Sequence, residues 1–188
     1  MWRLYKIMSN KKWYGSVNNR TDEGKNYLGR DELKAGDDIT MYYYSDRECY
    51  YIDEVISQKE IKVKRYYVCA DHSKNLSHGH QEWLYFKTLK EYRDYIKTIS
   101  PRTKFNHNYG GEPEAVTWVK RYGKWQEKII YNKTIVDYIM KRDGYCTFRP
   151  KNEKEQKMFD EGKDIIRYQD LNGKISFGVK DYYYDWEF

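Results

Sequence analysis

Metal-ligating side chains gather just after one strand-like run of the chain. Cys69, His72, His78 and His80 fall within twelve residues and include three of the four histidines. Thiolate sulfur and imidazole nitrogen are zinc ligands, and a tetrahedral site needs four such groups. The spacing Cys-x2-His-x5-His-x-His matches no standard structural zinc pattern, and the Ser, Asn and Gly residues between the ligands are typical of a solvated loop. The expected structure is therefore a plain polar loop, with a metal site as the alternative.

Nucleophilic catalysis needs a thiol or hydroxyl that an oriented base has activated. Cys69 with His72, or Cys146 alone, could supply a nucleophile, but no feature of the sequence indicates an oriented base. The chain contains no Gly-rich phosphate loop, no Gly-x-Ser-x-Gly and no His-Glu-x-x-His. The sequence thus predicts a non-enzymatic protein without a cofactor. A metal- or thiol-dependent enzyme is the third hypothesis for its function.

Basic and aromatic side chains alternate in two places, and such surfaces neutralise phosphates and stack on bases. Lys62, Lys64 and Tyr66 have the period-2 spacing that puts them on one face of a strand. The second set consists of Trp118, Lys120, Arg121, Tyr122, Lys124, Trp125 and Lys128. A solvated strand face in a lysine-rich protein explains the same pattern. Both sets are therefore candidate binding residues, with that interpretation left open.

The second set surrounds Gly123 in a predicted hairpin. Residues 101–150 hold ten basic and five acidic residues, which is most of the net charge of the chain. On an ideal strand Trp118, Lys120 and Tyr122 project to one side, while Val119 and Arg121 project to the other. One face can then be core and the other a recognition surface. We predict that this hairpin contacts the partner.

The amino-acid composition of the chain excludes several classes of protein. Aromatic residues make up 18% of the chain, and this excludes bulk disorder. No run of 18 apolar residues exists, so no transmembrane helix is expected, and the N-terminus has no apolar stretch typical of a secretory signal. The three scattered cysteines favour reduced thiols in a cytosol. The abundance of Lys, Tyr, Ile and Asn, together with few Ala and Pro residues, indicates a low-G+C bacterial or viral genome.

In the first half of the chain, short predicted strands position the candidate binding and metal-ligating residues. The strand-like runs cover residues 39–44, 49–56, 61–69 and 81–86. The first three are joined by short polar turns, which favour antiparallel hairpins. Thr88 and Glu91 have the spacing of a capping box and predict a helix that ends before Pro101. Residues 31–86 therefore predict a small antiparallel unit that resembles an open barrel.

The second half predicts another antiparallel sheet with short helices. The expected elements are a hairpin of 115–121 with 124–131, helices at 134–142 and 152–161, and a hairpin of 164–169 with 174–179. Asn152 is the expected cap of the second helix, and Asn172-Gly173 has the composition of a type I′ turn. The fold class is therefore α+β and β-rich, with two or three short helices in the second half. The predicted subdomains are 1–100 and 115–188, joined by a linker at 101–114.

Two stretches carry a resemblance to known sequences. They are GDDITMYYYSDRECYY at residues 36–51, with the strand that follows it to residue 69, and the ending ISFGVKDYYYDWEF at 175–188. Both resemble small phage and mobile-element proteins of low-G+C gut bacteria. Some of those proteins are similar to metagenome-derived anti-CRISPR proteins that inhibit the type II RNA-guided nuclease. No functional residue is carried over, because no motif defines inhibition.

The resemblance implies a non-enzymatic anti-CRISPR protein that binds a type II CRISPR effector nuclease in the host bacterial cytoplasm. It would block target DNA binding or cleavage, with the guide RNA or target DNA as additional contacts. The net charge of +6 argues against mimicry of DNA, which needs an acidic surface. The alternative is a small β-barrel nucleic-acid-binding accessory protein of a phage. Neither hypothesis requires a membrane or a small-molecule substrate.

Overall fold

The computed structural model describes residues 21–43, 46–71, 83–99 and 113–182. The chain forms two compact units, one of residues 1–115 with 172–188 and one of residues 116–171. The second unit is thus inserted into the first. The predicted subdomain 115–188 differs from this division at its end, where residues 172–188 belong to the first unit. Most of the predicted linker lies outside the described residues.

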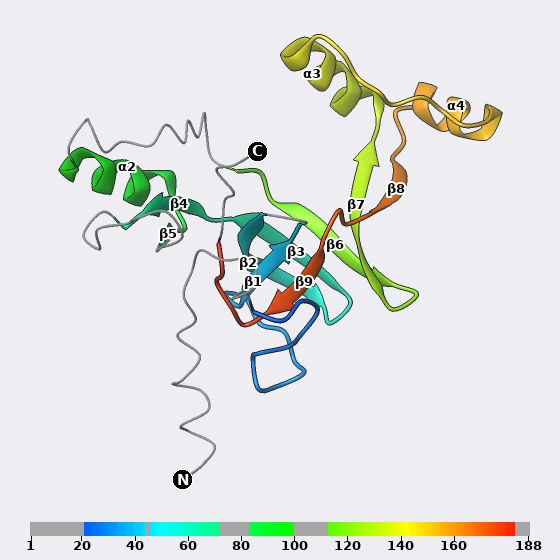
Figure 1. Ribbon diagram of the computed structural model, residues 1–188. Coiled ribbons are helices and arrows are strands. Elements are labelled where there is room, and N and C mark those ends of the chain that lie inside the picture. Colours follow the sequence, from blue (N-terminus) through cyan, green and yellow to red (C-terminus); the bar gives the residue numbers. More distant parts are fainter. Residues whose placement is uncertain (1–20, 44–45, 72–82, 100–112, 183–188) are drawn as a thin grey trace. The chain divides into compact units, whose positions relative to one another are not determined.

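Four antiparallel strands form the centre of the first unit (Figure 1). They are β1 (Asp38–Tyr42), β2 (Arg47–Ser57), β3 (Glu60–Arg65) and β9 (Lys174–Phe177), in the order β3-β2-β1-β9. Ile52 on β2 pairs with Val63 on β3, and both are almost completely buried. The β2–β3 register shifts twice, after Ile52 and after Val55. Such irregularities bend a strand and increase its twist, which fits the open, curled form predicted for this unit.

A two-stranded sheet and a helix complete the first unit. Strands β4 (Tyr67–Ala70) and β5 (Trp83–Phe86) pair with each other and contact α2 (Leu89–Thr98). The predicted single strand 61–69 is therefore wrong, because it is divided between two sheets. The break lies at Tyr66, whose N–H donates to the carbonyl of Cys49 over 3.0 Å. The predicted capping box is confirmed: Thr88 accepts from the Glu91 N–H and donates its own N–H to the Glu91 carboxylate.

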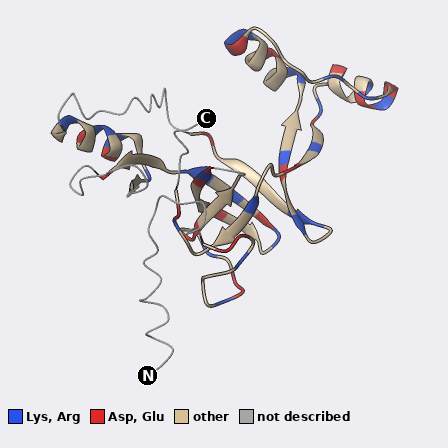
Figure 2. Ribbon diagram, viewed as in Figure 1, with Lys and Arg blue, Asp and Glu red and all other residues tan. Residues whose placement is uncertain are grey.

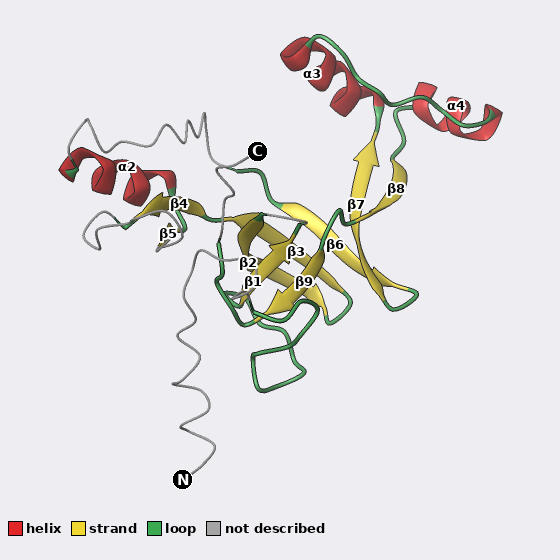
Figure 3. Ribbon diagram, viewed as in Figure 1, coloured by secondary structure: helices red, strands yellow, loops and turns green. Residues whose placement is uncertain are grey.

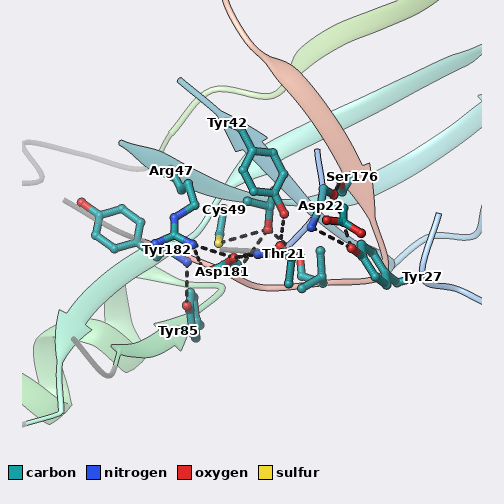
Figure 4. Close-up of polar contacts among 12 residues, drawn as sticks. Thr21, Asp22, Tyr27, Tyr42, Arg47, Cys49, Tyr85, Ser176, Asp181 and Tyr182 are labelled. Atoms are coloured by element: carbon teal, nitrogen blue, oxygen red, sulfur yellow. Dashed lines mark hydrogen bonds and ion pairs between the residues drawn. The ribbon is translucent and has the colours of Figure 1, made fainter. Parts of the chain in front are cut away.

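A buried ion pair fastens the segment after β9 to β2 (Figure 4). Arg47 Nη1 donates to both carboxylate oxygens of Asp181 over 2.8 Å, and each side chain is only 3% exposed. Thr21 donates its hydroxyl and its N–H to the same carboxylate over 2.8 and 3.1 Å. The Asp181 N–H donates to Thr40, whose hydroxyl donates to the carbonyl of Val179. A buried charge pair is tolerated when hydrogen bonds satisfy its remaining polar atoms, as they do for this carboxylate.

The second unit contains three antiparallel strands and two helices (Figure 3). Its elements are β6 (Val116–Arg121), β7 (Lys124–Tyr131), α3 (Lys133–Asp143), α4 (Glu153–Asp160) and β8 (Ile165–Asp170), and the strand order is β8-β7-β6. The hairpin around Gly123 is confirmed, with positive φ at both Tyr122 and Gly123, as a type I′ turn requires. The predicted Asn152 cap is also confirmed, since its side chain accepts from the Glu155 N–H.

The predicted hairpin around Asn172-Gly173 is wrong. Strand β8 pairs with β7, and β9 pairs with β1. Neither Asn172 nor Gly173 is among the residues with positive φ, so no type I′ turn forms. Gly173 is needed for a different reason: a Cβ there would collide with the carbonyl oxygen of Tyr42 on β1. The predicted fold class is nevertheless confirmed, because the chain is β-rich α+β with two antiparallel sheets and three described helices.

Candidate recognition surface

The register of the second unit assigns its strand residues to two faces of the sheet. Residues that pair directly across antiparallel strands share a face, and neighbours along a strand alternate between faces. Arg121 pairs with Lys124, Lys128 with Tyr168, and Ile130 with Ile166. We call the face with these six residues the open face. Thr117, Val119, Gln126 and Asp170 also lie on it.

The opposite, packed face is covered by other parts of the second unit. The rings of Tyr131 and Phe148 stack with centroids 4.5 Å apart, and Phe148 contacts Phe159 of α4 at 5.3 Å. Arg167 lies over Phe148 and donates to Glu155 over 2.9 Å. Phe148 is 8% exposed. These contacts cover the packed face at its Tyr131 end, and within the described residues no such cover is seen over Ile130, Ile166 and Tyr168 on the open face, all of which are exposed.

The burial of Trp118 and Glu127 is consistent with this assignment. These two residues pair across β6 and β7 on the packed face, and Trp118 is 1% exposed. Burial raises the pKa of Glu127, because it penalises the charged carboxylate. The buried strand residues of the second unit, Trp118 and Ile165, thus both lie on the packed face.

The open face combines cations with flat and branched apolar groups. The Arg121 guanidinium lies 3.8 Å above the ring of Tyr168, at stacking distance. Ile130 and Ile166 form a cross-strand apolar pair and are 38% and 47% exposed. At the tip of the hairpin, Tyr122 is 92% exposed. Figure 2 shows basic residues at the turn end of the β6–β7 hairpin. This composition suits an anionic partner that also offers apolar surface.

The second unit displays most of the exposed large apolar side chains. Seven of the nine in the described residues lie between 116 and 171. They are Tyr122, Ile130, Tyr138, Met140, Tyr145, Ile166 and Tyr168. A concentration of exposed apolar groups rimmed by charge marks interaction surfaces. The two helices of the unit add to it, because neither α3 nor α4 has a buried residue.

The predicted hairpin residues divide between the two faces. Arg121, Lys124 and Lys128 lie together on the open face, with Tyr122 at the turn. Lys120 and Trp125 pair with each other on the packed face. Trp118 lies there too, and its burial corrects the prediction that it offers contact area to a partner. Its side chain contributes to the interior instead.

Sequence reasoning missed three residues of the open face: Ile130, Ile166 and Tyr168. Their contribution depends on β8 pairing with β7, whereas the turn composition at Asn172-Gly173 had favoured pairing of this strand with residues 174–179. The alternation along this strand indicates only that Ile166 and Tyr168 share one side of β8. It did not show which strand lies beside β8.

The other predicted basic row is neutralised in the structure. Lys62 Nζ lies 2.6 Å from Glu54 and Lys64 Nζ lies 3.1 Å from Asp53. The prediction that Tyr66 is displayed for stacking is wrong, since it is 3% exposed and packs with Tyr51 in the core. Its hydroxyl donates to Asp38 over 2.7 Å. This strand therefore offers much less positive charge than its sequence indicates.

The candidate metal site and thiols fall mostly outside the site described above. His72, His78 and His80 lie outside the described residues, and Cys69 is a buried residue of β4. Burial raises the pKa of the Cys69 thiol to about 11 and that of Cys49 to about 12. Both shifts favour the protonated thiol at neutral pH, whereas the thiolate is the nucleophilic form. Within the described ranges, no three His, Cys, Asp or Glu residues gather as metal ligands.

Comparison of the chain with protein-family models, with curated proteins and with solved structures finds no match. None of the described helices has the length and apolarity needed to cross a bilayer.

Proposed function

We propose that this protein is a non-catalytic binding protein that docks on a nucleic-acid-containing effector through the open face of residues 116–171. The resemblance of residues 36–69 and 174–188 narrows the partner to a guide-loaded type II CRISPR effector nuclease. Occupation of that effector would block target DNA binding or cleavage. The place of action would be the host bacterial cytoplasm.

The observation that carries the proposal is the composition of the open face. Three cations, one of which is an arginine stacked on Tyr168, lie together with two exposed isoleucines on one face of the strands. Arg and Tyr are enriched at the centres of interfaces, and an arginine already held against a ring loses less conformational entropy on binding. No catalytic group is required, because inhibition needs only occupation of a channel or arrest of a conformation.

The positive charge of this chain and of its open face indicates which part of the effector the open face contacts. Inhibitors that imitate DNA present acidic surfaces to the DNA channel, but this chain has a net charge of +6 and its open face is basic. Electrostatic complementarity therefore favours contacts with guide RNA, target DNA or an acidic protein patch. The second candidate function, a nucleic-acid-binding accessory protein, is favoured by the same basic and aromatic surface.

Co-purification with a guide-loaded type II effector, followed by a target-cleavage assay, tests the proposal. We expect a stable complex and loss of cleavage at stoichiometric protein. The double variant Lys124→Glu, Lys128→Glu should lose both. Lys120→Glu is the control for the single variant Lys124→Glu, because both reverse one charge of the same hairpin, one on the packed face and one on the open face.

Two results separate the candidate functions. Absence of a complex with several guide-loaded type II effectors, combined with tight binding to nucleic acid alone, would replace the inhibitor by the accessory protein. Equal loss of binding in the Lys120→Glu control and in the double variant would exclude the open face as the contact surface under both.

A further inference from the structure

Resting on the proposed function, we infer that the open face binds single-stranded nucleic acid, with the Arg121–Tyr168 stack as its base-stacking platform. The inference names the chemical class of the ligand at that surface. Single-stranded nucleic acid presents phosphates and unpaired base faces together, and the open face offers cations and rings together.

The first argument comes from the geometry of the stack. Tyr168 is 39% exposed, and the Arg121 guanidinium lies 3.8 Å above its ring and 5.5 Å from the ring of Tyr122. A planar guanidinium held over a ring can stack on a base and also donate to a phosphate. Because Arg121 is already positioned, its ordering costs little on binding.

The second argument comes from the placement of the lysines. Lys124 is exposed beside Arg121, and Lys128 pairs with Tyr168 one strand away. Four residues along a strand span about 13 Å, so the two lysines can contact different phosphates of one strand. The cations thus run along the strand while the aromatic groups lie beside them.

The third argument distinguishes a single strand from a duplex. A duplex keeps its base faces stacked inside, so Tyr168, Ile130 and Ile166 would contribute little to binding it. The strand residues of the open face include three cations, and the carboxylate of Asp170 on the same face lowers its net charge. Phosphate contacts alone would therefore hold a duplex weakly, whereas each stacked base adds affinity on a single strand.

Fluorescence anisotropy with the full-length chain and a labelled oligo(dT) or oligo(U) of about 12 nucleotides tests the inference. Three neutralised phosphates predict a slope of about −2 in log K against log salt, which is an affinity loss of about 16-fold between 50 and 200 mM salt. An unlabelled duplex of the same length should compete poorly. Binding that is insensitive to salt, or equal competition by the duplex, would overturn the inference.

Substitutions at Tyr168 test the stacking role separately from charge. Tyr168→Phe keeps the ring and should retain affinity, whereas Tyr168→Leu should lose about 5- to 150-fold. Lys124→Glu with Lys128→Glu should weaken binding and flatten the salt slope, while Lys120→Glu changes neither. Circular dichroism and thermal melting verify that each variant is folded. Retention of full affinity in Tyr168→Leu would contradict the proposed role of Tyr168 in base stacking.

The failure of this inference is distinguishable from the failure of the proposed function. A chain that captures the guide-loaded effector and inhibits it, but binds neither oligonucleotide, contacts protein with its open face. That result keeps the function and overturns the nucleic-acid ligand. A chain that binds oligonucleotides but captures no effector keeps the ligand and overturns the function.

Discussion

The two units of this chain distribute their apolar side chains in opposite ways. Of the 21 buried apolar residues in the described ranges, 18 belong to the first unit, whereas residues 116–171 contribute Trp118, Phe148 and Ile165. Seven of the nine exposed large apolar residues lie in the second unit. The first unit also encloses the Arg47–Asp181 pair, while the ion pairs of the second are at least partly exposed.

This contrast indicates a division of roles within one chain. Burial of apolar area is the dominant source of stability, so the first unit carries the main stabilising core. The second unit is stabilised largely by local interactions. They are the turn at Tyr122-Gly123, the Asn132 and Asn152 helix caps, and cross-strand pairs. Its apolar groups remain exposed, in keeping with the proposed role in recognition.

The largest effect is expected from removing one partner of the buried ion pair. Arg47→Met leaves the Asp181 carboxylate buried without its cation and should lower the free energy of unfolding by about 3 to 5 kcal/mol. Urea denaturation measures the loss. The double variant Arg47→Met, Asp181→Leu removes both charges and should recover much of it. A single variant as stable as the parent would show that this pair does not hold the first unit together.

A smaller loss of stability is expected from adding a side chain at Gly173, where the chain that leads into β9 lies close to β1. Gly173→Ala places a Cβ against the Tyr42 carbonyl oxygen and 3.0 Å from Met41 Cγ, and overpacking of this kind costs about 1 to 3 kcal/mol. Gly123→Ala is the comparison in the second unit, where a Cβ has open space but φ is +79°. Hydrogen exchange should show Gly173→Ala weakening β1 and β9, and Gly123→Ala weakening only β6 and β7. The opposite pattern would contradict the division into units.

A matched pair of isoleucines tests the contrast in burial directly. Ile52→Val removes a methylene from the first core and should cost about 0.5 to 1.5 kcal/mol. Ile166→Val removes the same group from the open face, where surface substitutions stay within about 0.5 kcal/mol. Thermal melting of both variants measures the difference. Equal losses would mean that Ile166 is as well packed as Ile52.

The smallest effect is expected at Glu127, where burial raises the pKa of the carboxyl. The folded state disfavours its charged form, so Glu127→Gln should slightly stabilise the protein at pH 7. As pH falls through the raised pKa the parent takes up a proton, and the advantage of the variant should disappear. Melting temperatures from pH 4 to pH 8 test this, with Glu114→Gln at an exposed position as the control. A stability advantage of Glu127→Gln over the parent that grows as pH falls would contradict this prediction.

Local features of the fold could be predicted from the sequence because their hydrogen bonds span few residues. The Thr88–Glu91 capping box, the Asn152 cap and the Tyr122-Gly123 turn each involve neighbours within four residues. Lys124, Lys128 and Arg121 could be found in the same way, because one hairpin brings them together.

Distant pairings could not be predicted, because several partners satisfy the same strand pattern. The composition of Asn172-Gly173 favours a local turn, yet a neighbouring strand stands close enough to require glycine there. Tyr66 alternates correctly for an exposed position, but it turns into the core where one sheet ends and another begins. The contribution of Tyr168 depended on knowing the partner of β8. In each case tertiary packing decided between locally equivalent arrangements.

The Arg47–Asp181 pair can form only late in the synthesis of the chain. Its two residues are 134 positions apart, and at about 5 to 20 residues per second a ribosome needs about 7 to 27 s to make the intervening chain. Throughout that interval Arg47 lacks its counter-ion and β1 lacks its β9 neighbour, while the local turns and caps of residues 116–171 can already form. An unpaired strand edge is prone to pairing with other chains. The period of greatest aggregation risk therefore comes during synthesis and ends when residues 174–181 emerge.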